Sequence, residues 1–581
     1  MFSHRDYHPI PSTYQPSPPW RDNAHSESRY SAGTESQLIT SISERYSFPP
    51  NPQQWPFNVS PHVPEPDDDM HDPDTKNGKF VDAVESSFSS SRGWKNYGCL
   101  LILLAALLML FVGYPILTYV KRPESQRAGY NLGGINASGQ IPDLGNFGLI
   151  DLDTPQEAYT KKSLRGGSEW SLVFSDEFSK DGRTFYPGDD PYWEAVDLHY
   201  WGTNNMEWYS PEAITTQGGS LVFTFSEKQN HGLNYQGGMM TTWNKFCFTG
   251  GLIEASVQLP DANNISLLLY RWPAIWTLGN LGRAGYGATL DGLWPYSYDT
   301  CDVGTAPNQT VNGLPVAATI DGLEDANYAL SYLPGQRLSR CTCRSSEHPG
   351  PVHSDGTFVG RGAPEIDMFE AQVSDQVGEV SQSAQWAPFN DKYVWKNTSD
   401  NLIINDATIS KLNTYIGGKT QQATSVATQT NQGCYELSPD PCFSVYGFEY
   451  KPGFDNAYIS WMSDNKQAWT INAGGLAADD AVQISARPIP QEPMYIIMNL
   501  GMSKSFGEVD INHLTFPNHM RVDWIRVYQD PKKINVGCDP KDFPTQAYIQ
   551  KHMEAYQNPN KTTWVDDYKQ PWPKNSLIDT C

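Results

Sequence analysis

The chain has 581 residues and carries 41 basic against 65 acidic side chains, which gives a formal net charge of −24 at pH 7. This length allows more than one domain. The acidic balance argues against nucleic acid as a partner, because binding to phosphate groups needs a basic surface. Neutral sugars, by contrast, are indifferent to that charge.

Residues 1–97 are rich in Ser, Pro, Tyr, His and Asp and poor in aliphatic side chains. Residues 49–52 read Pro-Pro-Asn-Pro, and residues 67–69 are three consecutive aspartates. Such a segment cannot bury enough apolar surface to offset the entropy lost on ordering. The composition therefore predicts a disordered tail over residues 1–97.

Residues 98–120 form an uncharged, Leu-rich run. As a helix this run would be about 34 Å long, enough to cross the hydrocarbon core of a bilayer. A buried core helix is the alternative, but the run has no polar face. It is also too long, and starts too late in the chain, for the apolar part of a cleaved signal peptide. The sequence predicts a transmembrane signal-anchor helix over residues 98–120.

The orientation of this helix follows from the residues after it, because basic side chains flank both of its ends. Eight of the nine cysteines come after the run, namely Cys247, Cys301, Cys341, Cys343, Cys434, Cys442, Cys538 and Cys581. Glycosylation sequons after the run start at Asn136, Asn264, Asn308, Asn397 and Asn560, and one before it starts at Asn58. We expect a single-pass type II membrane protein of the secretory pathway (ER, Golgi or plasma membrane). Its carboxyl-terminal part would be lumenal or extracellular, with up to four disulfides whose pairing stays open.

A zinc site is a rival interpretation of Cys341 and Cys343, which have His348 and His353 nearby. Two cysteines at this spacing without a second pair form a weak zinc signature, and an oxidising compartment favours disulfides. We predict no metal and no cofactor.

Residues 169–530 alternate short apolar runs with Gly, Pro, Asn and Asp, which predicts an all-β domain. Clear strands are expected at 220–226, 251–259, 494–500 and 520–528, the second with Ile253, Ala255, Val257 and Leu259 facing inward. Many short strands without long helices indicate a sandwich or barrel. Residues 121–168 are assigned to a lumenal stalk. Residues 531–581 are assigned to a carboxyl-terminal extension with disulfide cysteines and a short helix after Thr545, where Ile549, Met553 and Tyr556 recur at helical spacing.

Aromatic residues make up 12% of the chain. Trp and Tyr rings stack on the apolar faces of sugars, while Asn and Gln bind hydroxyl groups, so a cleft lined by them suits a polysaccharide. Most aromatic side chains in an all-β protein are nevertheless core residues, and any single Trp is better interpreted that way.

Residues 365–370 read Glu-Ile-Asp-Met-Phe-Glu and place three carboxylates on one predicted strand. Strand alternation puts Glu365 and Asp367 on the same face. A one-residue bulge between Asp367 and Glu370 would bring Glu370 to that face, and bulges are frequent next to active sites. Retaining glycosidases need two carboxyl groups roughly 5–5.5 Å apart. An acidic strand edge is the alternative, but the apolar residues between the acids favour a packed strand.

These six residues resemble the E-x-D-x-x-E signature of glycoside hydrolase family sixteen, the laminarinase-like β-glucanases. Four flanking segments look like the fungal β-glucan synthesis-associated membrane proteins required for cell-wall β-1,6-glucan, namely 279–288, 292–304, 378–385 and 446–450. The resemblance runs from the membrane helix to the carboxyl terminus. It implies a concanavalin-like β-jelly-roll sandwich and type II topology.

The resemblance further implies Glu365 as nucleophile, Asp367 as its hydrogen-bonded helper and Glu370 as general acid/base. The charge on Glu365 is then expected to raise the pKa of Glu370. The implied function is a membrane-anchored retaining β-glucan hydrolase or transglycosylase in cell-wall β-1,6-glucan biosynthesis. A catalytically inactive glucan-binding or assembly protein, and an adaptor acting through its cytosolic tail, are the alternatives.

The expected partners are a β-glucan and, through one helix, a membrane; the oligomeric state is not predicted. Candidate sugar contacts are Asn205, Trp208, Trp276, Gln385 and Trp386. Residues 261–272 depart from the family pattern, because this stretch is unusually apolar for a loop.

Overall fold

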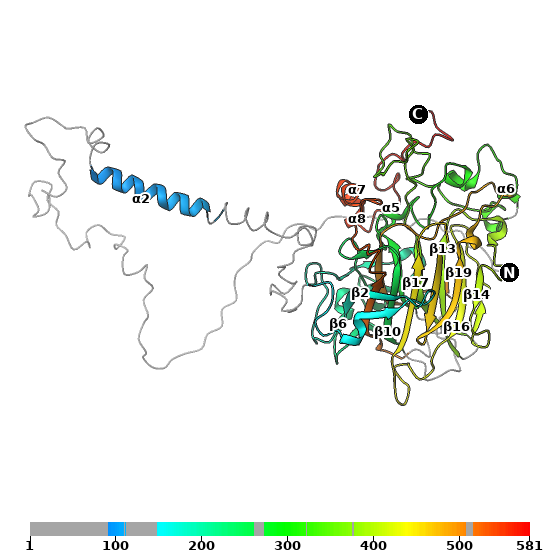
Figure 1. Cartoon of the computed structure of the whole chain (residues 1–581), viewed down its shortest axis with the longest axis horizontal. Helices are drawn as coiled ribbons and strands as arrows, with labels where there is room; N and C mark the ends of the chain where they lie inside the picture. Colours follow the sequence, from blue (N-terminus) through cyan, green and yellow to red (C-terminus); the bar gives the residue numbers. More distant parts are fainter. Residues whose placement is uncertain are drawn as a thin grey trace, which may run out of the picture. The chain divides into compact units, whose positions relative to one another are not determined.

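The computed structural model describes residues 91–109, 111, 148–260, 272–320, 322–374, 377–506 and 515–581. The chain divides into two compact units, Met1–Val112 and Gly113–Cys581. In the first unit, helix α2 runs over Ser91–Leu108 (Figure 1). Most of the predicted membrane segment beyond residue 109 lies outside the described residues, as do the sequons at Asn58, Asn136 and Asn264. None of the helices in the described ranges has both the length and the apolar character that a bilayer span requires.

Two β-sheets make up the body of the second unit, and their strands run side by side in Figure 1. Counted over the described residues, one sheet has ten strands and the other eleven. Among the described strands, the pairings are antiparallel except that between β5 and β8. The two sheets pack as a jelly-roll sandwich, which confirms the predicted fold class.

The first sheet has the order β1 (Thr160–Lys162), β2 (Glu169–Asp176), β21 (Asn518–Gln529), β10 (Gly251–Gln258), β17 (Ser444–Lys451), β18 (Tyr458–Ser463), β19 (Lys466–Asn472) and β14 (Leu402–Ile404), with β7 (Leu221–Phe225) on β21 and β6 (Ile214–Thr216) on β7. The second sheet has the order β15 (Ser410–Leu412), β16 (Gln422–Gln429), β13 (Val377–Trp386), β12 (Glu365–Ser374), β11 (Trp272–Gly279), β20 (Met494–Gly501), β8 (Tyr235–Thr241), β5 (Glu207–Tyr209) and β4 (Leu198–His199), with β3 (Glu194–Ala195) on β8 and β9 (Cys247–Phe248) on β20.

Short helices join the strands. The α-helical turns are α5 (Gly287–Leu290), α6 (Ala317–Ile320), α7 (Gln546–Lys551) and α8 (Met553–Gln557). The 3-10 turns are η4 (Gln156–Tyr159), η5 (Trp201–Thr203), η6 (Pro211–Ala213), η7 (Val303–Thr305), η8 (Pro307–Gln309), η9 (Glu324–Ala326), η10 (Asp391–Tyr393), η11 (Ala473–Leu476) and η12 (Lys504–Phe506).

Alternation along the strands builds the core between the two sheets. On β10, Ile253, Ala255 and Val257 are fully buried in this core, as the sequence predicted. They join the apolar side chains that β12 and β20 direct to the same side, such as Ile366 and Met498. Burial of a large apolar side chain stabilises the fold by about 1.5–3 kcal/mol, so this shared layer holds the sheets together.

The assignment of residues 121–168 to a stalk is wrong for the second half of this range. Strand β1 pairs with β2 at the edge of the first sheet. Lys161 Nζ lies 2.8 Å from Glu254 Oε2, and Ser163 Oγ donates to Glu449 Oε1 at 2.9 Å. Both glutamates are almost completely buried. A buried charge is costly without a partner. Residues 160–164 supply the partners of Glu254 and Glu449, and they therefore belong to the sandwich.

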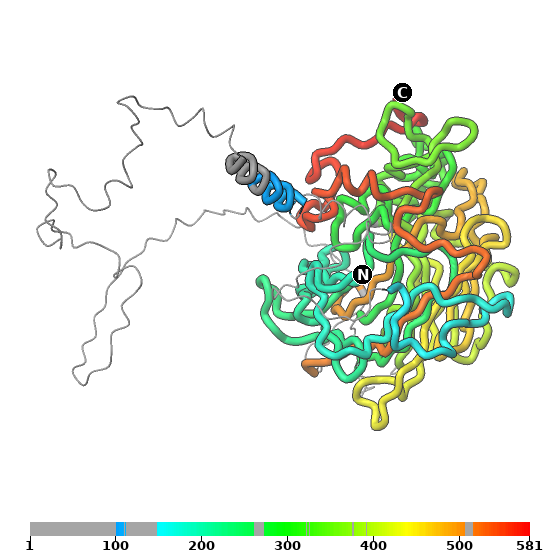
Figure 2. Tube along the Cα trace, turned by 60° about the vertical axis from the view of Figure 1, so that its left-hand side comes forward, coloured from blue at the N-terminus to red at the C-terminus, as the bar shows by residue number. Residues whose placement is uncertain are grey.

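The carboxyl-terminal extension packs against the same unit and is held by disulfides. The eight cysteines predicted to be oxidised form four pairs in the described chain: Cys247–Cys538, Cys301–Cys341, Cys343–Cys581 and Cys434–Cys442. Because Cys341 and Cys343 are both in disulfides, neither is available as a thiolate ligand for zinc. Figure 2 shows the red carboxyl-terminal segment running beside green segments from the middle of the chain.

The helix expected after Thr545 is present but divided. Helix α7 begins directly after Thr545, and α8 begins at Met553 after a break at His552. Ile549 and Tyr556 are fully buried, as their helical spacing predicted.

Candidate active site

A bulge in β12 places three carboxyl groups on one face of the second sheet. Asp367 pairs with Ser383 on β13, but Glu370 pairs with Ser381, so one extra residue is accommodated between the two acids. The register with β11 shifts at the same point. The predicted bulge is confirmed. Its effect is that Met368 and Phe369 both enter the core while the acids face the other way.

Each carboxyl group receives hydrogen bonds from a different part of the fold. The indole Nε1 of Trp294 donates to Glu365 Oε2, and that of Trp272 donates to Glu370 Oε1 at 2.9 Å. Asp367 Oδ2 accepts from two side chains of β13, Ser383 Oγ at 2.7 Å and Gln385 Nε2 at 3.1 Å. The middle acid therefore has the most donors, and each outer acid has one indole.

Burial favours the neutral form of all three groups. It raises the pKa of Glu370 to about 8, with a further contribution from the charge on Asp367. It raises the pKa of Asp367 to about 6, although the Ser383 and Gln385 donors oppose this shift. The pKa of Glu365 lies well above its usual range because of burial and then the neighbouring Asp367, while the Trp294 indole lowers it.

The source of the shift at Glu370 differs from the prediction, which assigned it to the charge on Glu365. Desolvation comes first, and the charge that adds to it is on Asp367. The physical reason is that the donors around Asp367 favour ionisation there more than on either neighbour. A site of this kind holds both a carboxylate and a carboxylic acid near neutral pH, which is what acid/base chemistry on a neutral substrate requires.

The outer two acids open into a cleft with a volume of about 710 Å³. Its floor comes from β11, β12 and β13, through Trp272, Trp276, Leu278, Glu365, Glu370, Ala371, Gln372, Ser381 and Gln385. Its rims come from residues 200–203 with Ser505, residues 285–294 with Thr562 and Thr563, and residues 333–334 with Asn413, Tyr415, Thr420 and Gln421. The volume and the mixture of indole, phenol and amide groups suit a carbohydrate.

The structure brings two of the five predicted sugar contacts to this cleft. Trp276 and Gln385 line it beside the carboxyl groups. Trp276 Nε1 is held by Asn499 Oδ1 at 2.8 Å, which fixes the plane of the indole. The side-chain amide of Gln385 also donates a hydrogen bond to Asp367.

The other three predicted contacts are not among the residues that line the cleft. The prediction that Trp386 contacts the sugar is wrong. Trp386 is completely buried in the core and donates a hydrogen bond to Thr424. The reason is that the residue after Gln385 points to the opposite face of β13. Asn205 is buried and bonded to Glu207 and Tyr209. Trp208 is stacked on His231 with ring centroids 3.9 Å apart.

Sequence reasoning missed several groups that face the acids. The indoles of Trp294 and Trp272 come from 71 and 98 positions away in the chain. The pKa of the Tyr200 phenol is raised by burial and by the three carboxyl groups, and that of Tyr415 by burial and Glu370. The only available signal was that Trp294 lies in a segment already noted for its family resemblance. Of residues 261–272, Trp272 alone lies within the described ranges.

Across the described residues, no cluster of three or more His, Cys, Asp or Glu side chains is arranged to hold a metal ion. The donors that surround the three acids are indole, hydroxyl and amide groups.

The fold and the site together define an all-β jelly-roll sandwich with a buried cluster of three carboxyl groups beside a cleft. The chain belongs to the beta-glucan synthesis-associated protein family SKN1/KRE6/Sbg1, whose model matches residues 57–581. This family is involved in β-glucan synthesis.

The chain is also similar to individual proteins. The beta-glucan synthesis-associated protein KRE6 of Saccharomyces cerevisiae is 40% identical over 529 residues, which cover 89% of this chain and 69% of that protein. A beta-glucanase of Rhodothermus marinus is 30% identical over 129 residues, or 22% of this chain and 40% of the glucanase. Among solved structures, the laminarinase catalytic domain of Thermotoga maritima is 19% identical and matches 62% of this chain and 98% of its own, with a TM-score of 0.34.

Proposed function

We propose that this protein is a retaining β-glucan hydrolase or transglycosylase that acts in β-1,6-glucan biosynthesis and cell wall organisation. The observation that carries the proposal is the bulged strand β12. It places Glu365, Asp367 and Glu370 on one face, with the outer two acids lining the cleft and a separate indole donor on each of them. Two carboxyl groups in different protonation states are what retaining glycoside cleavage uses.

In the first step Glu365 attacks the anomeric carbon as a carboxylate. Its proton passes to Asp367, to which it is hydrogen-bonded, as positive charge develops on the sugar. The glycosidic C–O bond breaks, and Glu370 donates its proton to the departing oxygen. The pKa of about 8 keeps Glu370 protonated at neutral pH for this role. The product is a glycosyl ester of Glu365 and a released sugar alcohol.

In the second step an acceptor hydroxyl attacks the anomeric carbon of the ester. Glu370, now a carboxylate, takes the proton of the acceptor, the bond to Glu365 breaks, and Asp367 returns its proton to the released Glu365 carboxylate. Water as acceptor gives hydrolysis, and a glucan hydroxyl gives transglycosylation. Membership of a β-glucan synthesis family supports transglycosylation, because synthesis needs net transfer rather than cleavage.

We further propose that the apolar run at residues 98–120 anchors the protein in a secretory membrane, with the sandwich on the lumenal or extracellular side. The four disulfides support this placement, since such bonds persist in oxidising compartments. The partner in the cleft is then a β-glucan.

The test is incubation of the purified protein with defined β-glucan oligosaccharides, followed by mass analysis of the products. We expect longer and shorter oligosaccharides together, the pattern of transfer. Glu365→Gln and Glu370→Gln should each abolish this redistribution while the circular dichroism spectrum stays unchanged. Binding without new products in the wild type would instead identify a glucan-binding protein, and unchanged activity in both variants would exclude the assigned roles.

A further inference from the structure

The carboxyl-terminal extension, residues 531–581, supplies part of the cleft. Thr562 and Thr563 line it, and the backbone of Thr562 lies against Gly287. The same extension contributes Tyr556, Trp564 and other buried side chains to the apolar cluster that includes the cleft-floor residues Trp276 and Leu278. The extension therefore packs against residues that form the floor of the cleft.

The extension is hydrogen-bonded to residues 281–294, of which residues 285–294 form one rim of the cleft. Ala288 N donates to Lys561 O at 2.9 Å, and Trp564 N donates to Asp291 Oδ2 at 2.9 Å. Tyr556 OH donates to Leu281 O at 2.7 Å. Two of these bonds are made by rim residues, so the rim has its neighbours in the extension as well as in the sandwich.

Trp572 contacts the rim at Gly292, two residues before Trp294. Its half-buried indole lies so close to Gly292 that a Cβ on that glycine would collide with the ring. Gly292 also has a φ of +73°, which favours glycine over other residues. Two residues later, Trp294 is fixed by its backbone N–H, which donates to Leu290 O at 2.9 Å. Its indole reaches Glu365.

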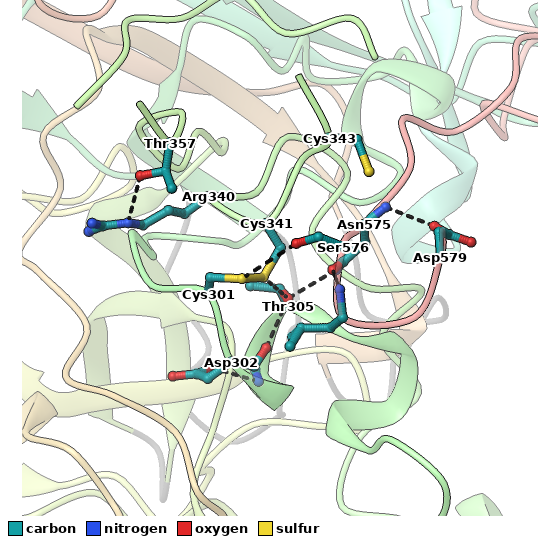
Figure 3. Close-up of a disulfide and its surroundings, with 12 residues drawn as sticks. Cys301, Asp302, Thr305, Arg340, Cys341, Cys343, Thr357, Asn575, Ser576 and Asp579 are labelled. Atoms are coloured by element: carbon teal, nitrogen blue, oxygen red, sulfur yellow. Dashed lines mark hydrogen bonds between the residues drawn. A yellow bond between two sulfur atoms is a disulfide. The ribbon is translucent and has the colours of Figure 1, made fainter. Parts of the chain in front are cut away.

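Both ends of the extension are fastened to the sandwich. Cys538 is bonded to Cys247, and Cys581 to Cys343. Between them, Asn575 Nδ2 donates to Thr305 Oγ1 at 3.0 Å beside the Cys301–Cys341 disulfide (Figure 3). Ser576 N donates to Cys341 O at 2.9 Å. Trp572 thus contacts the rim from a segment that is attached to the sandwich both before and after residue 572.

We propose that the extension is a positioning arm of the active site, in which Trp572 packs against Gly292 and thereby holds the Trp294 indole on Glu365. This inference rests on the proposed function only for its consequence on turnover. Trp572 touches neither substrate nor the acids, so it is a positioning residue. Its removal leaves space behind Gly292, and the turn that carries Trp294 relaxes away from Glu365.

The first experiment reads this contact without any need for turnover. The full chain is labelled with 5-fluorotryptophan, and the ¹⁹F resonance of Trp294 is assigned by its loss in Trp294→Phe. We expect the resonance to move in Trp572→Ala, which removes the ring packed against Gly292. It should also move in Glu365→Gln, which alters the hydrogen-bond acceptor of the Trp294 indole. It should stay in place in Trp524→Ala, the matched removal of a half-buried indole on β21 of the other sheet.

The second experiment measures kcat/KM on a β-glucan oligosaccharide. Trp294→Phe and Trp572→Ala should each lower it about tenfold or more, because a hydrogen bond to a charged group is lost. The double variant should fall no further than Trp294→Phe, because both changes remove the same bond. The acidic limb of the pH profile reports ionisation of the hydrogen-bonded pair Glu365 and Asp367, and it should move to higher pH in both variants, since the indole lowers the pKa of Glu365.

That pH shift is specific, because the other titratable groups that face Glu365 are unchanged by these variants. They are Asp367 and Glu370 on β12, Tyr495 on β20, and Tyr200 and Tyr415 on the rims. A purely structural loss at residue 572 would lower the amount of folded protein and leave the limb where it was.

The outcomes separate the two proposals. A wild-type protein that turns over no glucan defeats the proposed function, and the ¹⁹F resonance still decides whether Trp572 positions Trp294. An unmoved resonance in folded Trp572→Ala, or losses that multiply in the double variant, overturns the positioning arm. If Trp572→Ala does not fold, Gly292→Ala disturbs the same contact from the other side and should give the same resonance shift.

Discussion

Glu370 is a carboxyl group whose neutral form is favoured by the folded protein. Its pKa of about 8 lies above its ordinary value of 4.5, so its contribution to stability is full below about pH 4.5 and is lost as the pH rises through about 8. Glu370→Gln removes the ionisation but keeps the shape. We therefore expect this variant to melt roughly 2 °C or more above the wild type at pH 9, with a smaller difference or none at pH 6.

Thermal unfolding at the two pH values measures this effect. Glu157→Gln, which removes an exposed carboxyl group on η4, is the control and should not change the pH dependence. Parallel pH curves for Glu370→Gln and the wild type would show that burial does not hold the proton on Glu370.

The indole of Trp272 acts on the same acid in the opposite direction. Its N–H donates to Glu370 and lowers the pKa of that group. Trp272→Phe should thus raise the pKa of Glu370 and move the basic limb of kcat/KM upward by roughly 0.5–1 pH unit. Trp276→Phe is the matched control, because the Trp276 indole donates to Asn499 rather than to an acid. A limb that moves equally in both variants would contradict the assignment.

At the scale of a single element, the bulge in β12 is held by side chains from other strands. Trp461 Nε1 on β18 donates to Asp367 O at 2.8 Å, and Gln382 Nε2 on β13 donates to Met368 O at 3.1 Å. Trp461→Phe leaves a buried carbonyl group without this donor. We expect it to lower the free energy of unfolding by about 1–3 kcal/mol and to reduce turnover as well, because Asp367 moves with its backbone.

Chemical denaturation provides the measurement, and the neighbouring tryptophan provides the control. Trp469 stacks on Trp461 with centroids 4.1 Å apart, yet its own Nε1 has no hydrogen-bond partner among the described residues. Trp469→Phe should consequently cost less than Trp461→Phe. Equal costs would mean that ring volume rather than the bond to Asp367 supports the bulge.

The sequence predicted the elements whose signal is local. Alternation on β10 and the spacing of Ile549 and Tyr556 identified buried faces correctly, and the interval from Asp367 to Glu370 required a bulge if all three acids were to act together. The misses share one cause. Whether Gln385 or Trp386 faces the cleft depends on a register that differs by one residue, and the donors Trp294 and Trp272 come from distant strands and loops. The partners of Glu254 and Glu449 likewise lie in a segment with no strand pattern of its own.

At the scale of the whole molecule, the disulfides differ most in the length of chain that they close. Cys247–Cys538 spans 291 positions, and Cys434–Cys442 spans 8. In the chain-entropy model the longer loop restricts the unfolded state more, by about 3 kcal/mol. Replacing Cys247 and Cys538 together by Ala should therefore lower the free energy of unfolding more than replacing Cys434 and Cys442. Denaturant titration of both double variants checks this order, which a reversed result would refute.

The disulfide between Cys343 and Cys581 also constrains the order in which the disulfides form during synthesis. Because its second partner is residue 581 and the two are 238 positions apart, Cys343 emerges from the ribosome long before its partner exists. At about 5–20 residues per second, synthesis of the intervening chain takes roughly 10–50 s. During that interval the neighbouring Cys301 and Cys341 are both available to it, so correct pairing depends on Cys301 reaching Cys341 first. The Cys343–Cys581 bond closes the support behind Trp572, so the cleft is complete only after residue 581 has been made.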